Sequence, residues 1–120
     1  MVTVGLKALQ SRHASVRQMA AAVLLNVAFV IASAEADADA FADGAVQVLL
    51  GAVEALDSDD DAESTFRRLL CVGVILQQQR QHLDLARDLG IEATVAPLAR
   101  GAKDERVRRL AHELRALLAG

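Results

Sequence analysis

Apolar residues recur at three- and four-residue spacings along almost the whole chain, and this helical period constrains the fold more than any other feature. Turn signals, among them Gly44, Gly90 and the aspartate-rich segment 57–61, separate the periodic runs. We predict an all-α fold of about seven helices without strands. The predicted helices cover residues 2–10, 14–34, 45–56, 62–79, 81–89, 91–102 and 105–119.

The composition agrees with close-packed helices in one domain. Apolar residues make up 53% of the chain, mostly Ala, Leu and Val, with three Phe and no Trp or Tyr, which favours helices over a β-sandwich. A chain of 120 residues is long enough to bury an apolar core without disulfides. We therefore expect residues 1–120 to form a single domain.

Three of the predicted helices contain related hexads, SVRQMA at 15–20, TFRRLL at 65–70 and RVRRLA at 106–111. Each has an apolar residue, then an arginine, a polar or basic residue and an apolar pair. Their spacings of 50 and 41 residues are close to the period of armadillo and HEAT repeats. The sequence thus predicts an armadillo-like, right-handed helical repeat whose stacked helices line an extended groove.

The adjacent arginines Arg67 and Arg68 precede the apolar run 69–76. Neighbouring residues lie about 100° apart on a helix, so we expect one arginine to face the groove and the other the solvent. The candidate residues of a peptide-binding groove are Asn26, Arg67, Arg17 and Arg108.

Each of these residues also has a plainer interpretation. Arg67 and Arg68 fit an ordinary solvated pair that bonds to Asp60, Asp61 or Glu63. Asn26 fits a buried amide that joins two helices, and the other two arginines fit plain surface charge. The sequence alone leaves these alternatives open.

The charge pattern argues against several partners. The net charge of −3 gives no electrostatic case for nucleic acid or an anionic membrane. No Lys or Arg occurs between Arg17 and Arg67, where acidic residues are frequent, and we interpret this interval as solvated loops and caps. The uncharged stretch 18–34 imitates a secretory signal peptide, but its central Asn26 and its helical pattern favour a core helix.

Four stretches together resemble the PUL domain, the armadillo-like module that ends phospholipase-A-activating protein and its fungal counterpart. They are LLNVAFVI at 24–31, STFRRLLCVGVIL at 64–76, LDLARDLGI at 83–91 and ERVRRLAHELRALL at 105–118. The most specific part is Thr-Phe-Arg followed by an apolar run with Gly73, and then Leu-Ala-basic-x-Leu-Gly-Ile. These stretches are similar to the C-terminal half of such a domain.

The resemblance implies a non-enzymatic protein-interaction domain. PUL domains bind the C-terminal tail peptide of the AAA ATPase valosin-containing protein, which extracts ubiquitylated clients, through a basic groove on the concave side of the solenoid. The matching positions here are Arg67 and Asn26, whereas Arg17 and Arg108 are inferred from the hexads alone. Full PUL domains carry further N-terminal helices with another groove arginine, so helices of the parent protein are a second expected partner.

The alternative function is structural: a helical-repeat segment that completes a larger solenoid and has no ligand of its own. The single cysteine, Cys71, excludes an internal disulfide framework and fits a reducing compartment. The cysteine count by itself fixes no compartment; the localisation that we expect is the cytoplasm, and also the nucleus.

Catalysis and cofactors have little support. Cys71 stands inside an apolar run rather than at a helix N-terminus, so it is expected in the core and not as an activated nucleophile. His13, His82 and His112 are far apart in the sequence and form no i, i+4 pair, which is unfavourable for a metal site. No cofactor is expected.

Overall fold

The computed structural model describes residues 8–33, 38–54, 56, 59–78 and 81–119. Six α-helices and no β-strand occur within these residues. They are α2 (Ala14–Ser33), α3 (Ala38–Val53), α4 (Ala62–Gln78), α5 (Gln81–Asp88), α6 (Ile91–Gly101) and α7 (Glu105–Ala119). The all-α fold predicted from the helical period is confirmed.

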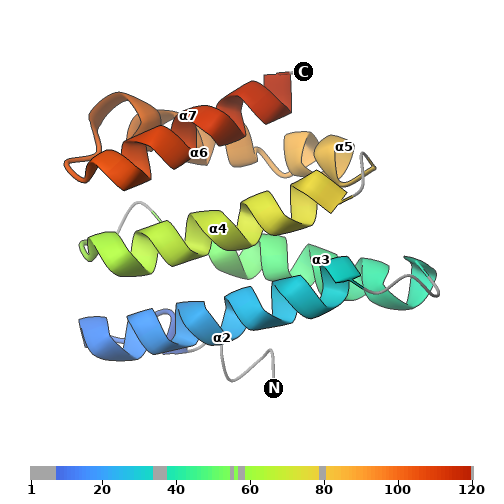
Figure 1. Ribbon diagram of the computed structural model, residues 1–120, viewed down its shortest axis with the longest axis horizontal. Helices are drawn as coiled ribbons and strands as arrows, with labels where there is room; N and C mark the ends of the chain where they lie inside the picture. Colours follow the sequence, from blue (N-terminus) through green and yellow to red (C-terminus); the bar gives the residue numbers. More distant parts are fainter. Residues whose placement is uncertain (1–7, 34–37, 55, 57–58, 79–80, 120) are drawn as a thin grey trace.

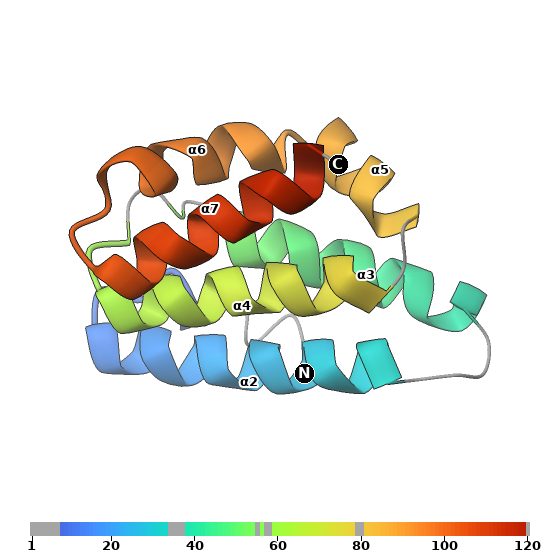
Figure 2. The same ribbon diagram turned by 45° about the horizontal axis from the view of Figure 1, so that its top comes forward.

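The helices form two layers. α2, α4 and α7 lie side by side and run in the same direction (Figure 1), whereas α3, α5 and α6 form a second layer behind them (Figure 2). The shortest dimension of the domain is 20 Å, which is the thickness of two helices of about 10 Å each. Each front helix is thus followed by a return through the second layer before the next front helix begins.

This order repeats along the chain as in an armadillo-like solenoid. The three front helices begin at residues 14, 62 and 105, a spacing close to the roughly 40–47 residues of armadillo and HEAT repeats. Each of the three related hexads falls in the first half of a front helix. The helical repeat predicted from the sequence is therefore confirmed, and the hexads mark equivalent helices.

The core lies between the layers and is centred on α4. Its residues Leu69, Val72, Ile75 and Leu76 are at most 2% exposed. α2 contributes short side chains, so its backbone lies close to α4, and the thiol of Cys71 donates to the Ala21 carbonyl with the sulfur 3.9 Å from the oxygen. α7 closes the other side with Val107, Ala111, Leu114 and Leu118, spaced three or four residues apart.

Polar residues fix the predicted helix ends. Asp61 accepts a hydrogen bond from the Ser64 amide at 2.8 Å and so caps α4, and this bond lowers the pKa of the Asp61 carboxyl. Asp104 accepts from the Arg106 amide at 2.8 Å and caps α7. Gly90 has φ of 72° between α5 and α6, a conformation that favours glycine. The turn signals at Gly90 and in segment 57–61 thus coincide with helix ends.

Two helix predictions need comment. The helix predicted to begin at residue 45 begins at Ala38, because Gly44 does not interrupt it and aspartates are favourable in the first turns of a helix. Residues 2–7 of the predicted first helix lie outside the described residues, and Leu9 and Gln10 form a turn. Pro97 lies inside α6.

The prediction that one arginine of the adjacent pair faces solvent is wrong. Arg68 is 1% exposed. Its Nε donates to the Ala52 carbonyl at 2.9 Å, its Nη1 to Asp59 Oδ2 at 3.2 Å and its Nη2 to the Glu54 carbonyl. The guanidinium therefore satisfies the carbonyls at the C-terminal end of α3, where a cation is favourable, and its charge is compensated by Asp59.

Asp59 also binds a second arginine. Its Oδ1 accepts from Arg17 Nε at 3.2 Å, and the Asp59 side chain is 1% exposed. Arg17 further donates to the Ser11 carbonyl at 2.9 Å and to Asp60 at 2.7 Å. We call Asp59, Arg17 and Arg68 the aspartate clasp. Through Arg17 the Asp59 carboxylate is linked to the start of α2. Through Arg68 it is linked to the second turn of α4 and to the end of α3.

We predict that Asp59→Asn lowers the free energy of unfolding by about 3–5 kcal/mol, because it leaves the buried Arg68 charge without its counter-ion. The matched control is Asp60→Asn, which removes the same charge from a side chain that is 89% exposed and is expected to cost less than about 1 kcal/mol. Urea unfolding of both variants measures the difference. Equal losses would show that the clasp does not hold the fold.

Candidate functional site

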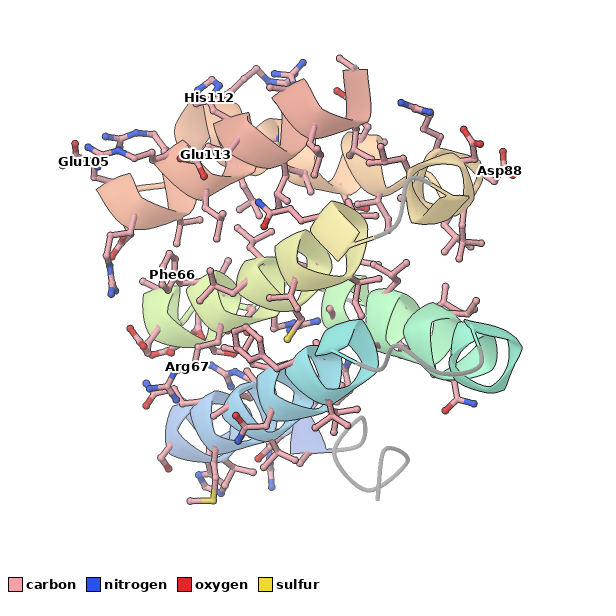
Figure 3. The ribbon with its side chains drawn as sticks, turned by 45° about the vertical axis from the view of Figure 1, so that its right-hand side comes forward. Phe66, Arg67, Asp88, Glu105, His112 and Glu113 are labelled. Carbon is pink, nitrogen blue, oxygen red and sulfur yellow. The ribbon has the colours of Figure 1, made fainter. Side chains whose placement is uncertain are left out.

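The middle front helix, α4, presents one stripe of side chains to the outside. Phe66, Arg67, Leu70 and Val74 are partly exposed, at three- and four-residue spacings, while the residues between them are buried. Figure 3 shows Phe66 and Arg67 on opposite flanks of this stripe, with Phe66 toward α7 and Arg67 toward α2. We call this surface, with the adjoining side chains of α2 and α7, the front face.

Arg67 bridges α4 and α2 at the front face. Its Nη1 donates to the Gln18 carbonyl at 2.9 Å, and its Nε donates to Glu63 Oε1 at 3.0 Å. The Arg67 side chain is 32% exposed, and Nη2 has no hydrogen-bond partner among the described residues. Two contacts thus hold the guanidinium in place while one amino group stays available to a ligand.

Asn26 lies farther along α2, on the same exposed stripe of the helix as Met19 and Val23. It is exposed, so the alternative of a buried amide between helices does not apply. It follows Gln18 by two helical turns, which is about 12 Å along the axis with a rotation of about 80°. An extended peptide rises about 3.3 Å per residue, so roughly four residues of such a peptide cover the axial rise from Gln18 to Asn26.

The structure does not bring Arg17 and Arg108 to this interval. Arg17 is 11% exposed, and all three of its guanidinium nitrogens are used within the aspartate clasp and its loop. Arg108 donates to the Ala102 carbonyl at 2.9 Å, in the turn between α6 and α7. Both arginines make local structural contacts.

Arg106 is a front-face residue that the hexads did not single out. Its Nη2 donates to Glu63 Oε2 at 3.0 Å, and its guanidinium lies over the Phe66 ring, 4.9 Å from the centroid. The hydrogen bond to Glu63, and after it the one to Asp104, raise the pKa of Arg106. Arg106 and Arg108 are two residues apart and so lie about 200° apart on the helix. No signal in the sequence pointed to Arg106, because its role depends on α7 being the neighbour of α4.

A shallow hollow of about 280 Å³ lies between α4 and α7. Phe66, Leu70 and Leu110 form its apolar floor, and Arg106, Arg109 and Glu113 form its rim. Figure 3 places Glu113 on α7 and Phe66 on α4 beside this hollow. Its side chains suit an apolar group that is flanked by polar or charged atoms.

The charges of the front face are nearly balanced. Glu63 is paired with Arg67 and Arg106, and Arg109 is paired with Glu105 at 3.0 Å. A ligand carboxylate that approaches the front face therefore finds Arg67, Arg106 and Arg109 already paired with glutamates of the same chain. This differs from the strongly basic groove that the resemblance implies.

A comparison with protein-family models decides the family. The model of the PUL domain matches residues 2–113. This chain belongs to the PUL domain family. The comparisons with curated proteins and with solved structures gave no match. The match agrees with the resemblance in the sequence, and PUL domains are protein-interaction domains.

Within the part of this PUL domain that the structure describes, Cys71 is fully buried in α4. Burial raises the pKa of its thiol to about 12. His13 and His112 are exposed, and Figure 3 shows His112 on α7 on the side away from α4. The position of Cys71 in the core is confirmed, and its thiol is unsuited to act as a nucleophile at neutral pH.

Two further observations concern other ligands. The described residues contain no group of three or more His, Cys, Asp or Glu side chains arranged to hold a metal ion. Among the described helices, none combines the length and the apolar character needed to cross a membrane. The stretch at 18–33 lies in α2, which packs against α4 and α3.

We predict that Cys71 in the folded PUL domain reacts with iodoacetamide at pH 8 at least about a hundredfold more slowly than in urea-unfolded chain, because its thiol is buried and protonated. Mass spectrometry of quenched samples measures both rates. A folded-state rate close to the unfolded rate would contradict the burial of this thiol and reopen the question of a reactive cysteine.

Proposed function

We propose that this PUL domain binds the C-terminal tail peptide of the AAA ATPase valosin-containing protein across the front face, as a non-enzymatic adaptor in the ubiquitin system. The observation that carries the proposal is the state of Arg67. Its guanidinium is fixed by the Gln18 carbonyl and by Glu63, its side chain is 32% exposed, and Nη2 has no hydrogen-bond partner among the described residues. A site that is fixed before binding loses little entropy when the ligand arrives.

The chemistry of the front face suits an extended peptide. Arg67 offers a charged donor for a carboxylate or a backbone carbonyl, and the exposed amide of Asn26 can both donate to a carbonyl and accept from an amide. The hollow beside Phe66 offers room for one apolar side chain of the ligand. The proposed site therefore consists of Asn26, Arg67 and the Phe66 hollow.

The expected affinity is modest. A charge-assisted hydrogen bond in a partly desolvated site contributes about 1.5–3 kcal/mol. Two or three such contacts give roughly micromolar dissociation constants after the cost of association. Because the ATPase is a hexamer, a parent protein that is tethered elsewhere would gain from avidity. The corresponding localisation, also proposed, is the cytoplasm and the nucleus.

Arg17 and Arg108 are left out of the proposed site. Their guanidinium groups are used in contacts within the domain. Substituting either arginine would therefore mainly lower the stability of the fold and would not test ligand binding directly. Arg106 takes the place on α7 that the hexads assigned to Arg108, because it faces Glu63 and Phe66.

A second candidate function is the structural one. α2 leaves apolar side chains exposed on its outer side, among them Val16 at 40%, Met19 at 70% and Val23 at 38%. In a solenoid, each repeat buries such a face against its neighbour. This observation supports a segment that packs against further helices of a parent protein. Asn26 lies one turn after Val23 on the same stripe, so such packing would compete with ligand binding at Asn26.

We predict that Arg67→Ala weakens binding of a synthetic peptide of the ATPase's last ten or so residues at least about tenfold, which is about 1.4 kcal/mol. The melting temperature should change little, because Arg67 is partly exposed and makes two hydrogen bonds with the described part of the chain. Isothermal titration calorimetry and thermal melts measure the two effects.

The matched control is Arg87→Ala. Arg87 also donates to a carboxylate of its own helix, Asp84, and to a carbonyl of another helix, Leu118, but it lies on α5 in the second layer. Its loss should leave binding within about twofold of wild type. If wild-type protein does not bind the peptide, or if both variants lose binding equally, the proposed function is wrong.

A further inference from the structure

Glu63 lies at the N-terminal end of the α4 stripe, between Arg67 and Arg106. It lies in the first turn of α4, and its two carboxylate oxygens are bound by two different arginines. Oε1 accepts from Arg67 Nε and Oε2 from Arg106 Nη2, both at 3.0 Å. The Glu63 side chain is 34% exposed, so it sits at the surface rather than in the core.

This arrangement has the form of a bound carboxylate ligand. Two guanidinium groups from neighbouring helices, α4 and α7, converge on one carboxylate, as they would on an anionic group of a peptide. Asp104 is the other carboxylate close to Arg106, with Oδ1 3.5 Å from Nε, but it also caps α7. Among the described residues, Arg67 has Glu63 as its single ion-pair partner.

We propose that Glu63 is an internal competitor that holds the carboxylate position between Arg67 and Arg106 and is exchanged for a carboxylate of the ligand. The ligand group is a peptide carboxylate, either the free C-terminus or an Asp or Glu side chain. The inference rests on the proposed function for the identity of the peptide, but the Glu63 exchange is a property of this chain.

The exchange is physically accessible. Partly exposed ion pairs are weak, because water screens them and ordering the side chains costs entropy. Glu63 is attached to α4 by a flexible side chain and can turn into solvent, whereas Arg106 keeps its place over the Phe66 ring, 4.9 Å from the centroid. Glu63 therefore lowers the affinity for carboxylates without blocking the site.

The competitor also sets specificity. A neutral ligand group that displaced Glu63 would give the two arginines a weaker acceptor. A ligand carboxylate, in contrast, replaces both of the charge-assisted hydrogen bonds that Glu63 gives up. The front face is then selective for carboxylate-bearing peptides even though its own charges are nearly balanced. A site without Glu63 would bind anions more tightly and discriminate among them less.

The test compares wild type with Glu63→Gln and Glu105→Gln. Both substitutions remove one negative charge from the first turn of a front helix, but Glu105 pairs with Arg109 alone among the described residues. The first probe is the ATPase tail peptide, with a free carboxylate or with a C-terminal amide. Glu63→Gln should bind the free peptide about three- to tenfold more tightly than wild type, and Glu105→Gln should stay within about twofold.

The amide reports which carboxylate is bound. If the gain in Glu63→Gln disappears with the amidated peptide, the C-terminus takes the place of Glu63, and if it persists, an acidic side chain does. Equal or weaker binding by Glu63→Gln would overturn the inference, because Glu63 would then orient the arginines rather than compete for them.

A second probe separates this inference from the proposed function. Acetylglycine is a minimal peptide carboxylate, and its binding is followed by the NMR signals of the Arg67 and Arg106 Nε–H groups. In Glu63→Gln these signals should move at lower acetylglycine concentrations than in wild type and Glu105→Gln. If the signals move as expected with acetylglycine, but neither wild type nor either variant binds the tail peptide, the proposed function fails and the inference stands. Signals that do not move in Glu63→Gln up to the solubility limit contradict the inference.

Discussion

The aspartate clasp is the interaction on which the other features of this PUL domain depend. One buried carboxylate, Asp59, compensates two arginines, and one of them, Arg68, also satisfies backbone carbonyls at the end of α3. Buried ion pairs contribute little net stability compared with apolar packing, but they allow few alternative arrangements once one partner is in place. The clasp therefore fixes the register of α2, α3 and α4 more than it adds to the stability of the domain.

The register has a direct consequence at the surface. Arg67 reaches the Gln18 carbonyl only if α2 and α4 lie at the heights that the clasp gives them, because Arg17 and Gln18 are neighbours on α2. The adjacent arginines therefore have different roles. Buried Arg68 fixes the register of the helices, and this register places the Gln18 carbonyl where it orients Arg67.

Much of the fold was predictable because it depends on local chemistry. The apolar period, the caps at Asp61 and Asp104 and the positive φ of Gly90 are set by residues within a turn of each helix end. The start of α3 was missed because Gly44 is a weak signal and can be accommodated inside a helix. The family was evident from the order of four motifs, which survives when individual repeats diverge.

The candidate site was less predictable, because it depends on which helices are neighbours. A helical projection shows that Arg67 and Arg68 diverge but not which of them meets Asp59, a partner in a loop. The hexads identified equivalent helices correctly, but arginines at equivalent positions make different contacts. Arg17 binds Asp59 in the clasp, and Arg108 binds a carbonyl in the turn before α7. Arg106 binds Glu63 because α4 and α7 are neighbours.

The central claim is that a peptide lies across the front layer and contacts both α2 and α4. The most direct measurement is an amide chemical-shift map of the labelled domain during titration with the ATPase tail peptide. The account predicts that the largest changes gather around Asn26 and Arg67, with α3 and α6 nearly unchanged. Changes centred on the second layer, with the signals of Asn26 and Arg67 unaffected, would contradict it.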